Sequence, residues 1–211
     1  MRADAEANRE RVLDAAAEVF AEEGIDAPLN LIAERAGVGK GTLYRHFVDR
    51  EAVIDGLAGR LQDRYADIAQ AAESAPTGWE GLAIYIDSVM AMYFDLPWMV
   101  VVRARARRLA STNGKAEEDF RRVLDRAWAE GSLRRDVELT DLAFVTSALG
   151  GLASLPEPVR STVVGRLRDI MFDGLRTEGV PRTPLGGKPL DVERFRKYLA
   201  ERAGVTDDDE E

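Results

Sequence analysis

Apolar side chains recur every three or four residues along most of this chain, a period typical of amphipathic helices. Residues 8–23, 29–36 and 40–47 each have this period, which predicts three helices, the last two of them short. Asp49 is a suitable N-cap for a fourth and longer helix that extends to about residue 72. The first part of the chain is therefore predicted to be helical with short connections.

The same period continues after a break at residues 74–78. It predicts five further helices, near residues 79–94, 97–111, 115–130, 140–154 and 158–178. Residues 112–114 are expected to connect two of these helices, residues 181–189 to form a linker, and residues 191–202 to form a last helix. No alternating strand pattern of useful length occurs, so we predict an all-α fold.

The pattern divides the chain into three parts. Residues 1–55 are expected to form a three-helix domain, and residues 56–180 a second, helical-bundle domain. Residues 181–211 are expected to hold the linker, the short last helix and an acidic tail, which ends in the run Asp207–Glu211.

Composition narrows the classes of protein. The chain has 211 residues and no cysteine, with 45% hydrophobic and 32% charged residues, which is ordinary for a globular protein. No stretch approaches the roughly 20 apolar residues that a membrane helix needs, and the N-terminus lacks the apolar segment of a secretion signal. We therefore expect a cytoplasmic protein. The net charge of −9 does not exclude nucleic acid, because a local basic patch governs docking.

The two short helices and the turn between them, residues 37–39, form the most informative feature. Glycine in such a turn allows a positive φ and a steep crossing of the two helices. In a helix-turn-helix, the first helix supports the second, whose N-terminal side chains enter the major groove of DNA. Leu43 and Phe47 are four residues apart and are expected to face the core. The residues expected to offer cations and hydroxyls to DNA are Lys40, Thr42, Tyr44, Arg45 and His46.

Two glycines and an arginine complete the expected DNA surface. Gly39 and Gly41 allow the backbone to approach DNA closely, and Arg50, at the start of the next helix, is expected to hold another phosphate. His46 is the only histidine of a chain without cysteine, so no metal site is expected.

Residues 8–55 resemble the N-terminal domain of the tetracycline-repressor (TetR) family of transcriptional regulators. The resemblance rests on many positions in the same order and spacing, within the run GIDAPLNLIAERAGVGKGTLYRHFVDREAV that begins at Gly24. It implies that Asn30, at the start of the second helix, contacts DNA together with the second short helix, the recognition helix. Gly39 stands where the family usually has serine or threonine, and Pro28 where a hydroxyl residue is frequent, so one helix cap and one phosphate contact differ.

The second domain is expected to respond to a small molecule. Its large side chains are mainly bundle core, but some are expected to line an apolar effector pocket. The candidates are Tyr85, Met90, Tyr93, Phe94, Trp98, Arg103, Trp128 and Phe144. The arginine-rich run over residues 103–108 has two interpretations, since its arginines either bind an anion or are solvated and paired with acids elsewhere.

Two late helices, within residues 140–154 and 158–178, carry wide apolar faces. The plain interpretation is the core of a single chain. The resemblance implies instead a four-helix dimer interface, and a helix-turn-helix protein reads two half-sites with two-fold symmetry. The candidate interface residues are Leu149, Leu152, Val163, Leu167, Ile170 and Met171.

We therefore expect a homodimeric regulator that binds a palindromic operator in double-stranded DNA and that a small-molecule effector releases. No catalytic residue, metal or cofactor is expected, because the sequence lacks a nucleophile–base pair, a P-loop and a dinucleotide motif. An all-α enzyme is disfavoured for the same reason. The alternative is a DNA-binding architectural or scaffold protein without an effector.

Overall fold

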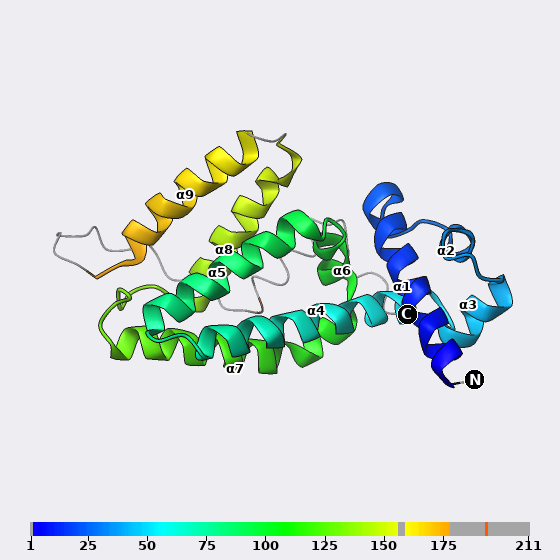
Figure 1. The fold of residues 1–211 in the computed structure, drawn as a ribbon, viewed down its shortest axis with the longest axis horizontal. Helices are drawn as coiled ribbons and strands as arrows, with labels where there is room; N and C mark the ends of the chain where they lie inside the picture. Colours follow the sequence, from blue (N-terminus) through cyan, green and yellow to red (C-terminus); the bar gives the residue numbers. More distant parts are fainter. Residues whose placement is uncertain (1, 156–158, 178–192, 194–211) are drawn as a thin grey trace. The chain divides into compact units, whose positions relative to one another are not determined.

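A computed structural model describes residues 2–155, 159–177 and 193 of the chain. Within these residues the regular structure is helical (Figure 1), and the prediction of an all-α fold is confirmed. The elements are α1 (Arg2–Glu23), α2 (Leu29–Arg35), α3 (Lys40–His46), α4 (Arg50–Glu73), α5 (Gly78–Asp95), α6 (Met99–Arg105), α7 (Arg107–Ala129), α8 (Leu139–Gly150), the 3₁₀-helix η1 (Gly151–Ser154) and α9 (Val159–Leu175). The predicted linker at 181–189 and the helix at 191–202 lie outside the described residues, except for Glu193.

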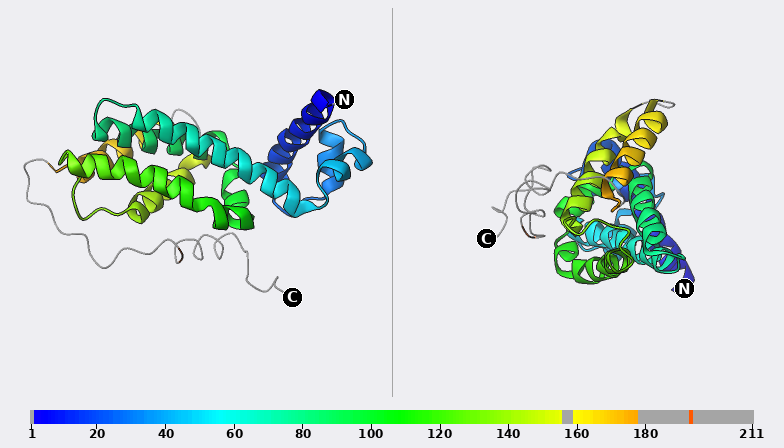
Figure 2. Two further views of the ribbon diagram at one scale, coloured as in Figure 1. Left: turned by 90° about the horizontal axis from the view of Figure 1, so that it is seen from below. Right: turned by 90° about the vertical axis from the view of Figure 1, so that its left-hand side faces the viewer.

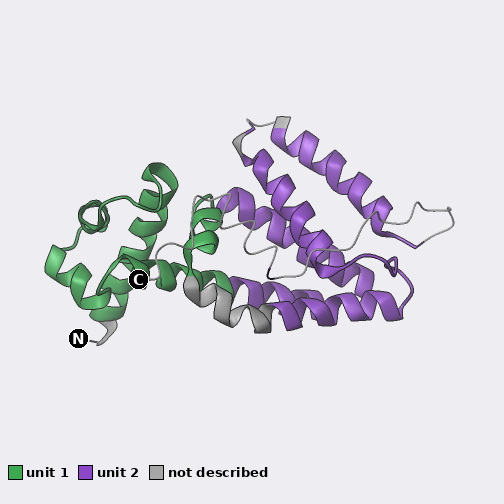
Figure 3. Ribbon diagram, turned by 180° about the vertical axis from the view of Figure 1, so that it is seen from behind, with its two compact units in different colours: residues 1–63, 96–112, 198–211 green, residues 64–95, 113–197 purple. Residues whose placement is uncertain are grey.

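The chain forms two compact units, shown in different colours in Figure 3, and each is described by itself. The described part of the first unit comprises residues 2–63 and 96–112. That of the second comprises residues 64–95, 113–155, 159–177 and 193. The predicted boundary after residue 55 falls inside α4, and the three-part division at residues 55 and 180 stays a prediction.

In the first unit, α1 packs against both α2 and α3. Its apolar stripe is fully buried, as the helical period predicts, and includes Val12, Leu13, Ala16, Val19 and Phe20. Ile32 of α2 and Leu43 of α3 are equally buried and close this small core. Asp49 accepts a hydrogen bond of 2.8 Å from the backbone amide of Ala52, so the predicted N-cap of α4 is confirmed.

In the second unit, α5 packs against α8 (Figures 1 and 2) and also contacts α7 at two places along its length. The approach to α7 is close because Gly78 has no side chain: a Cβ there would lie 2.5 Å from the backbone nitrogen of Ala127. Farther along the same two helices, the buried rings of Tyr85 and Phe120 stack with their centroids 3.9 Å apart.

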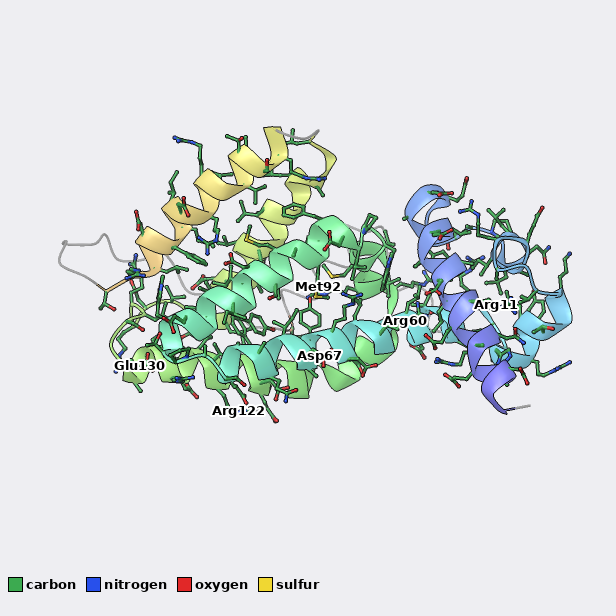
Figure 4. All side chains as sticks on the ribbon, in the orientation of Figure 1. Arg11, Arg60, Asp67, Met92, Arg122 and Glu130 are labelled. Atoms are coloured by element: carbon green, nitrogen blue, oxygen red, sulfur yellow. The ribbon has the colours of Figure 1, made fainter. Side chains whose placement is uncertain are left out.

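The junction between α4 and α5 is held by Arg122 and Arg126 of α7 and by Glu130, directly after α7; Arg122 and Glu130 are labelled in Figure 4. Arg126 donates hydrogen bonds of 2.7 Å to the carbonyl oxygens of both Ala75 and Pro76. Arg122 bonds Glu73 at 2.8 Å, and Glu130 accepts a bond of 2.5 Å from the amide of Gly78. This turn is therefore fixed by charged side chains from a distant part of the sequence.

One prediction of helix boundaries is wrong. The sequence predicts a helix over residues 97–111 and a connection at residues 112–114, but α6 ends at Arg105 and α7 runs without a break through residues 112–114. The break is at Ala106, whose backbone is extended with φ −69° and ψ 104°. Weak helix formers such as Thr, Asn and Gly each cost only about 0.5–1 kcal/mol in a helix, so they do not by themselves end one.

No single helix among the described residues is long and apolar enough to cross a membrane. The pair α5 and α6 meets the length and composition criteria only when the two helices are taken together.

Candidate nucleic-acid interface

The turn between α2 and α3 has the geometry that its glycines predict. Gly37 has a φ of 65°, in the left-handed region that side chains disfavour. Its backbone amide bonds the carbonyl of Glu34 at 3.1 Å, and the amide of Val38 bonds that of Ala33 at 3.0 Å. These bonds close the end of α2 and reverse the chain direction within four residues, so that α3 begins at Lys40.

The two faces of α3 are sharply different. Leu43 is 1% exposed, and Phe47, directly after the helix, is 3% exposed, so both predicted core positions are confirmed. Tyr44 between them is 50% exposed. The predicted DNA-binding residues of this segment separate into an exposed group, Gly39, Lys40, Gly41, Tyr44 and Arg45, and a half-buried pair, Thr42 and His46.

The cations of α3 have no acidic partner among the described residues, unlike Arg35 and Arg60 of the same unit. Arg35 on α2 pairs with Glu22 at 2.8 Å and with Glu18 at 3.2 Å, and its hydrogen bond lowers the pKa of Glu22. Lys40 and Arg45 make no ion pair or side-chain hydrogen bond within the described residues. Their charge is therefore available to an external anion.

Arg60 (labelled in Figure 4) is a second example of a neutralised arginine. It bonds Glu10 of α1 at 2.5 Å and Asp14 at 2.8 Å, which joins α4 to α1. Acidic side chains neutralise Arg35 and Arg60, whereas the positive charges of α3 have no such partner in the described chain. They form a local basic site on a protein with a net negative charge.

Two predicted contacts lie outside residues 39–46. Asn30 is exposed in the first turn of α2, where the N-cap Pro28 makes no side-chain cap. Arg50 is placed differently from the prediction: its Nη1 donates to the carbonyl oxygens of Ile25 (2.7 Å) and Ala27 (2.6 Å). This guanidinium holds the α1–α2 connection against the start of α4, so the geometry supports a structural role and gives no support to a phosphate contact.

The predicted effector residues do not all belong to one unit. Trp98 and Arg103 lie in the first unit, and the other six candidates in the second. Of those six, the buried ones are Tyr85, Met90 and Tyr93, whereas Phe94, Trp128 and Phe144 are half-buried. Trp128 has a structural partner, because its Nε1 donates to the carbonyl of Arg134 at 3.1 Å.

The predicted dimer residues also differ in how far they are exposed. Leu149 is 8% exposed, so the chain itself already buries it. On α9, Leu167 is 38% and Ile170 is 64% exposed, although both are large and apolar. Leu152, Val163 and Met171 are half-buried. The exposed apolar stripe is therefore on α9 and not on the middle of α8.

Two features near this interface escape sequence analysis. Val48, two residues after the end of α3, is 76% exposed, and it lies outside the helical period that predicts the faces of α3. Arg105 of α6 pairs with Glu51 of α4 at 3.2 Å, across 54 residues of sequence. For Arg105, this pair favours the second interpretation of the arginine-rich run, pairing with an acid. The side chains of Arg107 and Arg108 lie outside the described part of the chain.

Comparison with known proteins agrees with this geometry. The family model "Bacterial regulatory proteins, tetR family" matches residues 12–57. The HTH-type transcriptional repressor KstR2 of Rhodococcus jostii is 33% identical over 148 residues, which are 64% of this chain and 72% of that protein. The chain belongs to the TetR family.

Solved structures of TetR-family proteins are similar along most of the chain. A TetR transcriptional regulator from Streptomyces coelicolor has 30% identity and a TM-score of 0.56, covering 81% of this chain and 99% of that one. The ketosteroid transcriptional regulator KstR2 of Mycobacterium tuberculosis has 26% identity and a TM-score of 0.58, covering 81% and 95%. This TetR-family chain is a DNA-binding transcriptional regulator, and its relatives are regulators and not enzymes.

Proposed function

We propose that this protein is a homodimeric repressor that binds an inverted-repeat operator through α3 and releases it when a hydrophobic small molecule binds. The observation that carries the proposal is the exposed face of α3, on which Lys40 and Arg45 have no partner among the described residues while Tyr44 is half exposed. Backbone contacts by such cations fix a recognition helix on DNA, and side chains at its start read base edges.

We propose DNA contacts for those predicted residues whose side chains or backbone are at least partly exposed. They are made by Asn30, Gly39, Lys40, Gly41, Thr42, Tyr44, Arg45 and His46. Arg50 is left out because two backbone carbonyls already occupy its Nη1. Lys40 and Arg45 serve mainly as phosphate contacts, and Tyr44 with Thr42 is assigned to base edges.

The dimer is formed through the exposed stripe of α9, which includes Leu167 and Ile170. Exposed large apolar side chains in one stripe are a common sign of a protein interface. A two-fold dimer holds two recognition helices at half-sites of opposite direction, so the operator is an inverted repeat. Members of the family bind operator DNA and small molecules and act as dimers.

An apolar effector is supported by the composition of the second unit, where Tyr85, Met90 and Tyr93 are large, buried and mostly apolar. The similar protein from Mycobacterium tuberculosis is described as a ketosteroid transcriptional regulator. We propose a ligand of that chemical kind, a fused-ring or comparably bulky apolar molecule with few polar groups. Repression is supported by the Rhodococcus jostii relative, which is a transcriptional repressor.

Coupling between effector and operator is proposed to run through α6 and α4. Arg105 of α6 pairs with Glu51, and the neighbouring Arg50 holds the carbonyl of Ala27 just before α2. A shift of α6 is thereby passed to the helix-turn-helix through side chains in contact. The substitution Glu51→Gln is expected to keep operator binding while it reduces the effector's ability to release the operator.

Selection of bound duplexes from a random DNA pool at near-physiological salt tests the proposal. The wild type and Tyr44→Ala are run side by side. Enrichment of an inverted repeat by the wild type alone supports a dimer that reads sequence through α3. Equal enrichment by both proteins, or none by either, contradicts the assignment of α3 as the reading helix.

The same selected duplex then tests for an effector. Apolar ring compounds are added to the complex, and release is followed by fluorescence anisotropy together with the emission of Trp98 and Trp128. A ligand that quenches tryptophan and releases the duplex supports the repressor, while the absence of any such ligand from a broad apolar set favours an architectural protein.

A further inference from the structure

Helix α9, which carries the exposed apolar stripe, is joined to α5 by three arginine contacts in regular order. Arg160 lies over the ring of Phe94 at 5.7 Å, Arg168 bonds Asp87, and Arg176 lies over Trp79 at 4.4 Å. The residue numbers of the α5 partners decrease, from 94 to 87 to 79, as those of the arginines increase. The two helices are therefore antiparallel, and each step along both is seven or eight residues.

The central contact of this series is an ion pair with two parallel hydrogen bonds. The Nε of Arg168 donates to Oδ1 of Asp87 at 2.6 Å, and Nη2 donates to Oδ2 at 2.6 Å. Arg168 also lies 4.2 Å from the ring centre of Phe172 and bonds the exposed Asp169 at 3.2 Å. Such two-pronged pairs fix direction as well as distance, which a single-point contact does not.

Arg168 occupies a position where the helical period would place an apolar residue. The inward face of α9 consists of Val164, Phe172 and Leu175, each 8% exposed. Residue 168 lies four positions from both Val164 and Phe172, in the middle of that stripe. A charged group at such a position is an established way to specify the register of two helices, at some cost in packing.

The far end of α9 is fixed by main-chain bonds. The amide of Arg134 bonds the carbonyl of Leu175 at 3.0 Å, and that of Thr177 bonds the carbonyl of Ser132 at 3.3 Å. The middle of α9 depends on the Asp87 pair, whose side chains are 33% and 41% exposed and so are accessible to salt. The helix is thus held by main-chain bonds at its end near residue 175 and by a salt-accessible ion pair near residue 168.

We propose that the Arg168–Asp87 pair is a brace that sets the angle of α9, and that it thereby controls dimerisation and operator binding. Arg168 is a positioning residue, because it acts through the outward stripe of Leu167 and Ile170 and makes no contact with DNA. The inference rests on the proposed dimer. It further requires that salt weakens the dimer, since high ionic strength screens the pair while it leaves apolar contacts intact.

Sedimentation equilibrium of the full chain tests this brace. The variants are Arg168→Met, Asp87→Asn and the charge exchange Asp87→Arg with Arg168→Asp. Arg166→Met is the matched control, since Arg166 is exposed on the same helix and makes no ion pair or side-chain hydrogen bond within the described residues. We expect each single variant to weaken the dimer about 5- to 10-fold at low salt. The charge exchange should recover dimerisation to within about 2-fold of the wild type, while Arg166→Met stays at the wild-type value.

Thermal unfolding of the same proteins separates a brace from a general loss of structure. The Asp87 side chain is 41% exposed and stays solvated when its partner is removed, so Arg168→Met should lose less than about 1 kcal/mol of the free energy of unfolding while its dimer is weaker. A dimer of wild-type strength in Arg168→Met, or a charge exchange as weak as the single variants, would overturn the brace alone. A monomeric wild type would overturn the proposed dimer as well, and operator selection would report that independently.

Discussion

The guanidinium of Arg50 donates a hydrogen bond of 2.6 Å to the main-chain oxygen of Ala27, one residue before the N-cap of α2. A second bond to Ile25, at 2.7 Å, fixes the same connection. The position of the helix-turn-helix therefore depends on a side chain from α4. The sequence alone predicts a DNA contact for this arginine, because a cation at a helix start near the motif is equally suited to a phosphate.

Substitution of Arg50 is expected to lower the stability of the fold and not to remove a direct contact with DNA. Arg50→Ala leaves two carbonyl oxygens without their donor, which should cost about 1–3 kcal/mol of the free energy of unfolding. Urea denaturation followed by circular dichroism measures this cost. Arg45→Ala, which removes an exposed and unpaired cation, is the control and should change stability by less than about 0.5 kcal/mol. Equal stability of the two variants would show that the Arg50 bonds contribute nothing.

If the apolar stripe of α9 forms the dimer interface, a charged side chain placed in that stripe should disrupt the dimer. Ile170→Glu should weaken dimerisation at least about 100-fold, because it places an unpaired carboxylate in an apolar interface. Ile84→Glu is the control, since Ile84 is also a large exposed apolar residue, at 36%, but lies on α5. Sedimentation velocity distinguishes the dimer from the monomer. An intact dimer in Ile170→Glu together with a monomer in Ile84→Glu would move the interface from α9 to α5.

The space around Gly150, at the end of α8, is too small for a side chain. A Cβ at this position would lie 2.5 Å from Cγ and Cδ1 of the buried Tyr93. Gly150→Ala should therefore lower the free energy of unfolding by about 1–3 kcal/mol through overpacking. Gly59→Ala, inside α4 with open space around it, should instead raise that free energy by about 0.5–1 kcal/mol. Chemical denaturation of both variants checks the opposite signs.

Glu10 predicts a small pH dependence of stability. The hydrogen bond from Arg60 lowers the pKa of Glu10 below its usual value of 4.5, against the opposing effect of partial burial. A carboxyl with a lowered pKa in the folded state stabilises the protein above pH 4.5, and the contribution is lost as the pH falls through the lowered value. Because the side chain of Glu10 is 44% exposed and solvent screens the pair, the contribution should stay below about 1 kcal/mol.

Glu10→Gln should therefore be less stable than the wild type at neutral pH and converge with it in acid. Glu34→Gln, at an exposed carboxyl without a partner in the described chain, is the control and should follow the wild-type curve throughout. A difference between Glu10→Gln and the wild type that grows on acidification would contradict the assigned direction.

Much of the fold follows from the apolar period alone, because amphipathic helices bury one stripe wherever they pack. The core positions Leu43 and Phe47 and the cap Asp49 were predictable for this reason. The break at Ala106 was not, since it carries no glycine or proline, whereas the Asn113–Gly114 pair suggested a turn and lies in a continuous helix. Local propensity is a weak signal when long-range packing opposes it.

The site was predictable as far as it lies on one short helix. The exposed residues of α3 follow from its period, with Leu43 and Phe47 marking the opposite face. Contacts between distant segments were not predictable. The pairs of Arg50 with Ala27 and of Arg168 with Asp87 join residues 23 and 81 positions apart, and nothing in either local sequence identifies the partner.

The salt dependence of binding to the selected operator tests the central claim most directly, that the unpaired charge of α3 meets DNA phosphate. Wild type, Lys40→Ala and Arg135→Ala are titrated against one duplex from low to physiological salt; Arg135 is an exposed cation of the second unit. Each lost phosphate contact should reduce the slope of log affinity against log salt by about 1 per protomer. We predict a lower slope and weaker binding for Lys40→Ala and an unchanged slope for Arg135→Ala. Identical slopes for the wild type and Lys40→Ala would contradict the account.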